Sequence, residues 1–203
     1  YGAEEKEDLA EYKLTQLING FGLFIFVYMT GFGIWMVSIG KLDTAFFDLV
    51  TAVMVLANIL LLRLHRKVHH AAEILVGILT VVILYLAATG GWQGMGLLWI
   101  VIYPLVALAL DGVLQGTVWS LGLLAAVILM YVNRNALGLY DYGERYRYAD
   151  LMFRTLVFIY VAVFTVTIAF ARNRKSFYRE IKRLSLTDPL TMVPNRRSII
   201  AML

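Results

Sequence analysis

The stretch AEILVGILTVVILYLAAT, residues 72–89, decides the fold class because it is long and apolar and carries one charged residue in eighteen. A helix of about 20 mainly apolar residues crosses the hydrocarbon core of a bilayer. Five further segments before and after this stretch meet the same requirement. The six predicted spans are Leu17–Ile39, Phe46–Leu62, Ala72–Thr89, Gly96–Leu110, Val113–Val132 and Leu151–Ala171. The fourth is the shortest, and the fifth follows it almost directly.

The composition agrees with these spans. Of the 203 residues, 61% are hydrophobic and 16% are charged, whereas soluble domains are about 45–50% apolar and about 25% charged. The absence of cysteine excludes disulfides, thiolate metal sites and thiol redox centres. Residues 1–16 are polar and lack the basic and then apolar order of a cleavable signal peptide. We therefore expect an all-α integral membrane protein, with residues 1–16 as a separate cytoplasmic segment and residues 17–171 as a six-helix transmembrane bundle.

Lys and Arg collect in two places, which predicts the orientation of the chain. RLHRKVHH, residues 63–70, follows the second span, and ARNRKSFYREIKR, residues 171–183, follows the sixth. Positive charge near the ends of spans is retained on the cytoplasmic side. An even number of spans separates the two stretches, so both can lie inside. The N- and C-termini are then both cytoplasmic.

Beyond the sixth span, apolar residues recur at spacings of seven, four and three. They are Phe170, Phe177, Ile181 and Leu184. This spacing predicts the seam of a parallel coiled coil, a dimer stalk through which two copies would associate. Arg174 interrupts the seam at a core position. The pattern alone leaves open a basic amphipathic segment that lies on anionic lipid headgroups.

The stretch SLTDPLTMVPNRRSII, residues 185–200, is polar and densely patterned. It resembles the opening of the GGDEF domain of bacterial diguanylate cyclases, where a linker helix runs into D-x-L-T-x-L-x-N-R-R. The matching residues are Asp188, Leu190, Thr191, Asn195, Arg196 and Arg197, and Val193 stands where the family usually has Leu. Pro189 disfavours helix at the residue before it and would end the stalk there. The resemblance covers less than a tenth of the chain.

The resemblance implies that residues 188–203 begin a GGDEF domain and that residues 172–187 are a coiled-coil signalling linker. A diguanylate cyclase makes cyclic di-GMP from two GTP molecules bound with Mg²⁺, one on each of two facing domains. The family's catalytic residues would lie beyond Leu203, so we assign none in this chain, and no cofactor is expected in it. The opening motif would position the domain. The implied location is the inner membrane of a bacterium.

The expected function is therefore a membrane sensory and dimerisation module that transmits a signal through a helical stalk to a cytoplasmic cyclase. Two alternatives stay open, namely a passive dimerising anchor and a membrane protein that binds haem or another small molecule. Six spans exceed what anchoring requires. The expected partners are the lipid bilayer, a second copy of the chain and an unidentified small-molecule ligand, with no nucleic acid.

Aromatic residues in two regions are candidates for ligand binding. Residues 88–122 are rich in glycine, hold Pro104 in the fourth span, and resemble a segment of multi-span sensory domains in bacterial GGDEF proteins. The candidates there are Trp92, Trp99, Tyr103 and Trp119, which could wall a cavity open to the outer face. The alternative is that small residues pack helices while Trp and Tyr lie at the headgroup belt.

The connection before the sixth span contributes a second set of candidates. They are Tyr140, Tyr142, Arg145 and Arg147. Such a mixture could bind an anionic or aromatic molecule through paired hydrogen bonds and cation–π contacts. The alternative is an interfacial helix with tyrosines at the lipid boundary.

Polar residues near the inner ends of the spans are weaker candidates. His65 and His69 are four residues apart and could face a metal or a haem. Neighbouring Arg and Lys repel cations, however, and no Cys or nearby Asp completes a ligand set, so a solvated loop is favoured and no metal site is expected. Asn58, Glu73 and Asp111 are the polar residues that we place nearest membrane depth, the last two at inner span ends.

Overall fold

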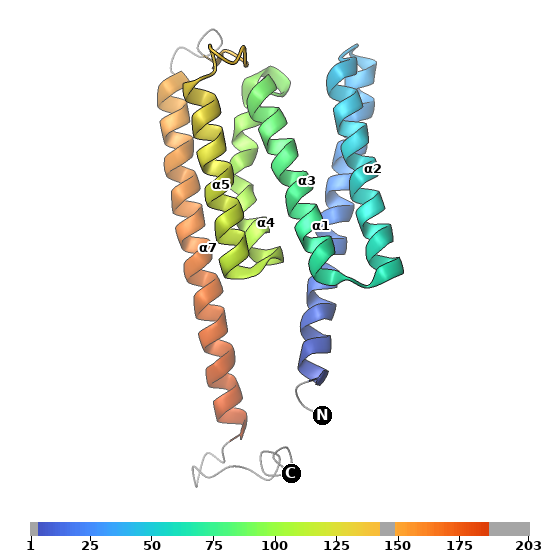
Figure 1. Ribbon diagram of the computed structural model, residues 1–203, viewed down its shortest axis with the longest axis vertical. Coiled ribbons are helices and arrows are strands. Elements are labelled where there is room, and N and C mark those ends of the chain that lie inside the picture. The colour runs from blue at the N-terminus through green and yellow to red at the C-terminus, as the bar shows by residue number, and fades with distance from the viewer. Residues whose placement is uncertain (1–3, 143–148, 187–203) are drawn as a thin grey trace.

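The computed structural model describes residues 4–142 and 149–186, with the backbone alone for residues 4–10, 93, 149, 151 and 172–186. Helices account for most of these residues, and no strand is found among them (Figure 1). The elements are α1 (Glu4–Ser38), α2 (Leu42–His65), α3 (Val68–Thr89), the 3₁₀-helix η1 (Trp92–Ile102), α4 (Tyr103–Leu110), α5 (Gly112–Val132) and α7 (Ala149–Leu186). The predicted all-α class is confirmed.

The helices form two groups joined by α3. Helices α1 and α2 pack as a hairpin, and α3 contacts both of them as well as η1 and α5. Helix α7 packs against η1, α4 and α5 (Figure 1). The turns at residues 39–41, 90–91 and 133–142 lie at one end, here called the cap end. The opposite end, beyond which α7 and the start of α1 extend, is here called the stalk end.

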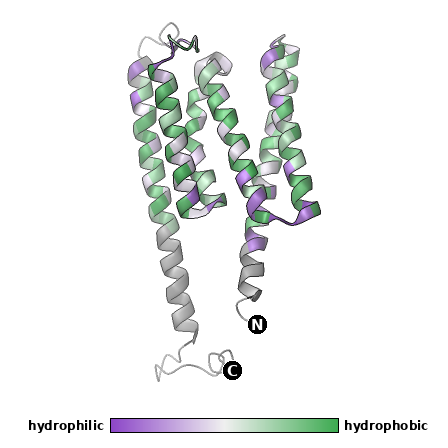
Figure 2. Ribbon diagram, in the orientation of Figure 1, coloured by the Kyte–Doolittle hydropathy of each residue, from purple (hydrophilic) through white to green (hydrophobic). Residues whose placement is uncertain are grey.

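Five helices are long and apolar enough to cross a membrane. They cover Glu11–Ser38, Leu42–His65, Val68–Thr89, Gly112–Val132 and Met152–Ala171. Their outward faces are apolar as well, as the hydropathy colouring shows (Figure 2). Leu114 is 83% exposed and Phe158 is 75% exposed. A surface of this kind is stable against lipid and unstable against water, so the chain is a helical membrane protein.

The fourth predicted span differs from the expected α-helix. Residues Trp92–Ile102 form a 3₁₀-helix, and α-helical geometry begins only at Tyr103. Gly90 and Gly91 have φ values of 77° and 58°, which few other residues adopt, and they reverse the chain after α3. Because this turn consumes residues, the apolar helix that follows, Gly94–Leu110, is shorter than the other five.

Close approach of η1 to α3 contributes to the same change. The Gly96 N–H donates to the Gly90 carbonyl at 2.9 Å. A Cβ at Gly96 would lie 2.5 Å from the Leu86 carbonyl oxygen, so only glycine allows this contact. Pro104, within the fourth predicted span, occupies the first turn of α4, a position that tolerates the missing N–H of proline.

At the two ends of the bundle, helices continue beyond the predicted spans. Helix α1 begins at Glu4, so the described part of the polar N-terminal segment continues the first span rather than forming a separate unit. The sixth predicted span and the linker are one helix, because α7 runs without interruption to Leu186. The side chains of Phe177, Ile181 and Leu184 and the whole of the GGDEF-like motif lie outside the described residues.

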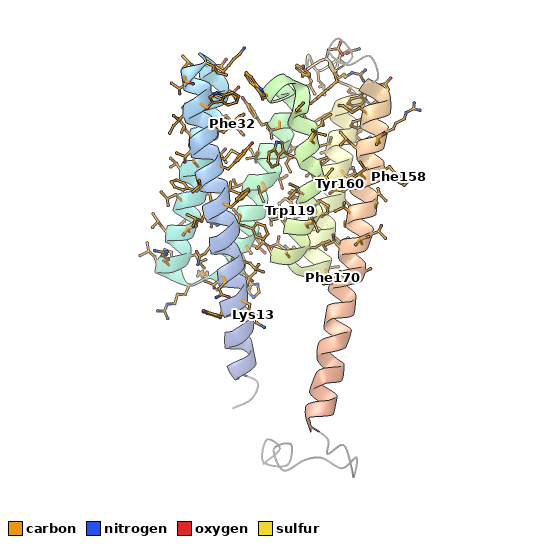
Figure 3. The ribbon with its side chains drawn as sticks, turned by 180° about the vertical axis from the view of Figure 1, so that it is seen from behind. Lys13, Phe32, Trp119, Phe158, Tyr160 and Phe170 are labelled. Carbon is orange, nitrogen blue, oxygen red and sulfur yellow. The ribbon has the colours of Figure 1, made fainter. Side chains whose placement is uncertain are left out.

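Two hydroxyl contacts tie the core together between helices. Tyr103 is 2% exposed, and its OH lies 2.6 Å from Thr80 Oγ1 of α3. Tyr160 is fully buried, and its OH donates to the Ser120 carbonyl of α5 at 2.7 Å. Figure 3 shows Tyr160 directed into the bundle, whereas Phe158 of the same helix points away from it. One face of α7 is therefore fixed to the bundle and another is free.

Candidate functional site

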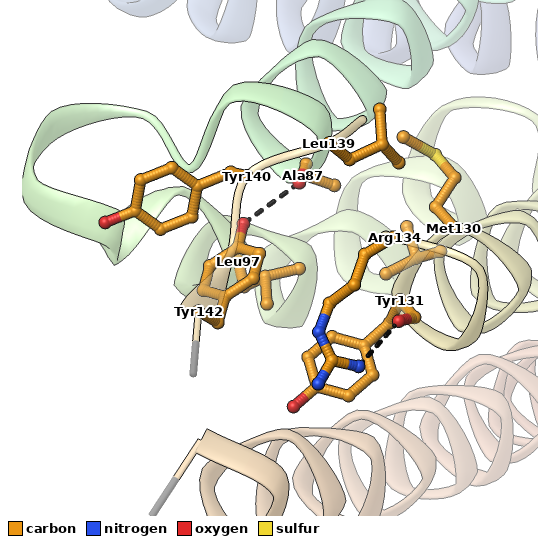
Figure 4. A pocket seen from close by; sticks show the side chains of 9 residues that line it. Ala87, Leu97, Met130, Tyr131, Arg134, Leu139, Tyr140 and Tyr142 are labelled. Atoms are coloured by element: carbon orange, nitrogen blue, oxygen red, sulfur yellow. Dashed lines mark hydrogen bonds between the residues drawn. The ribbon is translucent and has the colours of Figure 1, made fainter. Parts of the chain in front are cut away.

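The cap end carries a cluster of polar and aromatic side chains. After α5 the chain turns through residues 133–139, with Gly138 at φ 63°, and returns over the end of α3. There the Tyr140 N–H donates to the Ala88 carbonyl at 2.9 Å. We call Tyr131, Arg134, Tyr140 and Tyr142 the tyrosine cap (Figure 4).

Tyr142 closes the cap over the last turn of α3. Its side chain is 2% exposed, and its OH donates to the Ala87 carbonyl at 3.0 Å (Figure 4). Tyr140 meets it edge to face, with ring centroids 4.8 Å apart. The last carbonyls of a helix have no partner within the helix. The cap therefore supplies hydrogen bonds that α3 could not otherwise make in an apolar setting.

Gly90 gives the Tyr140 ring its place. The residue ends α3 with φ 77°, and a Cβ built on it would lie 2.5 Å from the ring of Tyr140. Both the backbone conformation and the contact require glycine. The absence of a side chain at Gly90 therefore leaves the space that the Tyr140 ring occupies.

Tyr131 connects the end of α5 to the start of α7. Its ring stacks on Phe153 with centroids 3.6 Å apart, and its OH donates to Asp150 Oδ1 at 2.8 Å. The guanidinium of Arg134 lies 4.5 Å above the other face of the ring, and Nη1 donates to the Tyr131 carbonyl at 2.9 Å. The first turn of α7 is thus held by the cap.

The charges around Arg134 are loosely paired. Its Nε lies 3.9 Å from Asp141 and its Nη2 lies 3.8 Å from Asp150, both longer than a hydrogen bond. The two carboxylates are exposed, so solvent weakens each pair. Nε itself is buried and donates no hydrogen bond. Arg134 therefore retains a buried donor that a carboxylate or another acceptor could use.

A small hollow lies beneath the cap. It is lined by Ala87, Leu97, Val127, Met130, Tyr131, Arg134, Leu139, Tyr140 and Tyr142. A second hollow, which shares Leu97 and Val127, continues between η1, α5 and α7 towards Tyr160. Each has a volume of about 10 Å³, enough for about one water molecule. A larger ligand can enter only if Tyr140 and Tyr142 move.

The four aromatic candidates of the glycine-rich region occupy different surroundings. Trp92 packs edge to face on Trp35 of α1 at 5.0 Å, and Trp99 meets Tyr28 of α1 at 5.3 Å. These contacts link η1 to the α1–α2 hairpin. Tyr103 is buried in the core, as described above.

Trp119 of α5 packs partly buried against the core. None of the four glycine-region candidates lines the hollow beneath the tyrosine cap. Of the loop candidates, Tyr140 and Tyr142 belong to the cap, while Arg145 and Arg147 lie outside the described residues.

The sequence analysis missed three residues that the structure makes prominent. Tyr131 and Arg134 were passed over, although their spacing of three residues at a helix end allows the ring and the guanidinium to meet. Asp48 was also passed over, although it is the one charged residue within the predicted span Phe46–Leu62. In α2 it is 4% exposed.

The stalk end holds a cluster of polar residues around Asp111, which connects α4 to α5. The pKa of Asp111 is raised to about 6, chiefly by burial and also by the nearby Glu73 carboxylate, while His69 opposes the shift. Gln115 donates a long hydrogen bond of 3.4 Å to Glu73. Two carboxyl groups therefore share one partly buried corner.

The remaining polar candidates have structural surroundings. Asn58 is 3% exposed and donates to the Ala71 carbonyl at 2.9 Å, which joins α2 to the start of α3. His65 and His69 are exposed at the stalk end. Within residues 4–142 and 149–186, no three His, Asp or Glu side chains are placed to share a metal ion.

Comparison of the chain with protein-family models, with curated proteins and with solved structures finds no match. The class of protein that the fold defines is a helical membrane protein with a long helical extension at one end. Its function is therefore inferred from the geometry and from the motif near the C-terminus.

Proposed function

We propose that the chain is a membrane sensory and dimerisation module that passes a signal from the tyrosine cap through α7 to a cytoplasmic diguanylate cyclase. The observation that carries the proposal is the continuity of α7. The helix starts at Ala149, where its neighbour Asp150 binds Tyr131, and it ends at Leu186, two residues before Asp188 of the GGDEF-like motif. One rigid element therefore joins the candidate site to the expected enzyme.

The length of α7 suits this task. Its 38 residues extend about 57 Å at 1.5 Å per residue. The hydrocarbon core of a bilayer takes about 30 Å of that length. More than 20 Å then extends beyond the bundle as a stalk, the arrangement seen in Figure 1. A movement of the first turn at the cap is transmitted along the helix because an α-helix compresses little.

The proposal includes six membrane crossings. The shortest crossing consists of η1 and α4, and the 3₁₀ geometry of η1 lengthens it. Eleven residues of η1 rise about 22 Å at 2.0 Å each, and eight residues of α4 rise about 12 Å at 1.5 Å each. Together they reach about 34 Å, as long as a normal span. Six crossings leave both termini on one side, which the basic residues near 63–70 and 171–183 make the cytoplasmic side. The cap end then faces outward from a bacterial inner membrane.

A second copy of the chain is the proposed partner of α7. Ile159, Val166 and Phe170 are 39%, 69% and 72% exposed. At 100° per residue, positions 159, 166, 170, 177, 181 and 184 fall within about 60° of the helix circumference. We call this line the α7 stripe. It runs beside the buried face that carries Tyr160, so the helix can contact its bundle and a partner at once.

The proposed mechanism is a two-state change of α7. A cyclase of this class needs two GGDEF domains, each with GTP and Mg²⁺, in a facing arrangement. Rotation or sliding of two parallel stalks changes how those domains face. Two packings that differ by a few kcal/mol suffice for a switch if the stimulus binds one of them better.

Cysteine crosslinking tests the dimer. The chain has no cysteine, so one introduced thiol reports a single position. In membranes under oxidation, Val166→Cys on the α7 stripe should form a dimer. Leu156→Cys on the buried face, where the side chain is 6% exposed, should not. Equal crosslinking of both variants, or none at Val166→Cys, would contradict the proposed interface.

Phased insertions test signalling against passive anchoring. A complete GGDEF domain replaces residues 188–203, joined so that its opening motif starts at position 188, and residues are inserted after Ala171. Seven residues keep the phase of a heptad seam, whereas three residues rotate it. We expect the seven-residue insertion to retain the synthesis of cyclic di-GMP from GTP and the three-residue insertion to change it severalfold. Identical rates in both would indicate an anchor.

A further inference from the structure

Asp48 is a carboxyl group inside the bundle that the proposed function does not use. It lies six residues after the start of α2 at the cap end, on the face that packs against α1. Its side chain is 4% exposed. A Cβ built on Gly33 of α1 would lie 3.3 Å from the Asp48 Cβ, so the two helices are in close contact at this level.

The carboxyl group has no compensating charge. Its Oδ2 atom is buried and has no hydrogen-bond partner. Within the described part of the chain, no Lys, Arg or His forms an ion pair with Asp48. An isolated carboxylate at membrane depth costs several kcal/mol, and a neutral carboxyl costs far less. The packing that is observed therefore suits the protonated form.

The titratable groups that face Asp48 are phenols. Tyr28 approaches it from α1 and Tyr85 from α3, and both sense the charge of the carboxylate. Asp43, on the same helix, also acts on Tyr85 and adds negative charge. None of these three groups carries a positive charge, so none can form an ion pair with an ionised Asp48. Ionisation of Asp48 would therefore work against the contact between α2, α1 and α3.

The space around the carboxyl group favours a proton over a larger cation. Leu49 would lie 3.0 Å from a Cβ on Gly33, and Phe47 stacks on Tyr85 with centroids 3.6 Å apart. An organic ammonium group needs a cavity, and a metal cation needs several oxygen ligands. A proton needs neither.

We infer that Asp48 is a proton-binding site at the outer end of the bundle, and that its ionisation loosens the α1–α2 hairpin from α3 and η1. The carboxyl lies about 9 Å along the helix axis from the start of α2. On the proposed orientation, its protons come from the outer side. The site is a property of the bundle, and it exists whether or not a cyclase follows the stalk.

Tryptophan contacts provide a readout of the hairpin. Trp35 of α1 packs on Trp92 of η1 at 5.0 Å, and Tyr28 of α1 meets Trp99 of η1 at 5.3 Å. Loosening the hairpin separates these rings, which changes the tryptophan emission. The measurement needs no knowledge of a ligand or of the downstream domain.

The test is a pH titration of tryptophan emission for the 203-residue chain in lipid nanodiscs. It is made in an Asp111→Asn background, because the pKa of Asp111 is raised to about 6 and its titration would overlap the measurement. We expect a reversible transition that Asp43→Asn, an exposed control on the same helix, leaves in place. Asp48→Asn should abolish the transition and hold the low-pH spectrum at every pH. Infrared difference spectra should show a carboxylic-acid carbonyl band that is absent in Asp48→Asn.

Three results would overturn the inference. The first is an emission spectrum of the Asp111→Asn protein that does not change with pH. The second is a transition in Asp48→Asn equal to that of its parent. The third is a transition produced at constant pH by sodium or ammonium salts, which would make the ligand a larger cation. If Asp48→Asn loses its helical circular dichroism, Asp48→Glu takes its place and should keep a transition at a shifted midpoint.

Discussion

Replacement of Gly90 by alanine tests whether the tyrosine cap is seated on the end of α3. The added Cβ would lie 2.5 Å from the ring of Tyr140, so the ring must leave its position. Tyr140 and Tyr142 are separated by one residue, and their rings make an edge-to-face contact. Displacement of the first ring should therefore unseat the second.

The expected cost has three parts. A left-handed conformation costs an alanine roughly 1–2 kcal/mol. Loss of the hydrogen bonds from the Tyr140 N–H to Ala88 and from the Tyr142 OH to Ala87 costs about 1 kcal/mol each. Exposure of the Tyr142 ring, which is 2% exposed in the cap, adds roughly 1.5–3 kcal/mol at most. Gly90→Ala should thus lose roughly 4.5–7 kcal/mol of unfolding free energy.

Gly138→Ala is the matched control. Gly138 has φ 63°, similar to that of Gly90, but a Cβ there would meet nothing within 4 Å. It should lose only the conformational part, roughly 1–2 kcal/mol. Equilibrium unfolding by dodecyl sulfate in mixed micelles measures both variants on the same scale. If both lose the same free energy, Tyr140 does not rest on Gly90 and the cap is not a latch between α3 and the loop.

Three further predictions concern the interior and the stalk end. Gly116→Ala should cost roughly 1–3 kcal/mol in the same unfolding assay, because its Cβ would lie 2.6 Å from a backbone oxygen of α4, whereas Gly122→Ala, with nothing within 4 Å, should cost nothing. Asp111→Asn should raise the free energy of unfolding by roughly 1–3 kcal/mol at pH 7 and leave it unchanged near pH 4. The pKa of Asp111 is raised from its usual 3.8 to about 6 in the folded protein. The wild-type chain therefore loses stability as the pH rises from about 4 to about 6. A gain that does not vary with pH would contradict this. Tyr160→Phe should lose roughly 0.5–1.5 kcal/mol of unfolding free energy, because it removes only the hydroxyl that donates to the Ser120 carbonyl. An unchanged stability would show that this hydrogen bond does not stabilise the fold.

The apolar runs were predictable because hydrophobic length is a local property of the sequence. Five of the six predicted spans correspond to helices of membrane-spanning length. The remaining one, the fourth predicted span Gly96–Leu110, has 3₁₀ geometry up to Ile102, and this geometry depends on tertiary contacts. Gly96 approaches the backbone of α3 so closely that the helix tightens, and no count of apolar residues contains that information.

The candidate site was predictable only in part. Tyr140 and Tyr142 stood out as a cluster of aromatic residues in an outer loop. Their partners on α3 are main-chain carbonyls, which have no signature in the sequence. Asp48 carried a plain signal, a single charge within an apolar run, but its lack of a partner depends on which faces of α1 and α3 meet it.

The 3₁₀-helix η1 is longer than an α-helix of the same residues would be. The same eleven residues would be about 5.5 Å shorter as an α-helix, since the rise per residue falls from about 2.0 to about 1.5 Å. That difference equals the pitch of one α-helical turn. Gly96 is pinned to the end of α3, so a change of winding in η1 would draw the start of α4 towards the cap end. Helix α7 packs on both η1 and α4, so it lies alongside a segment whose length changes with its helical winding.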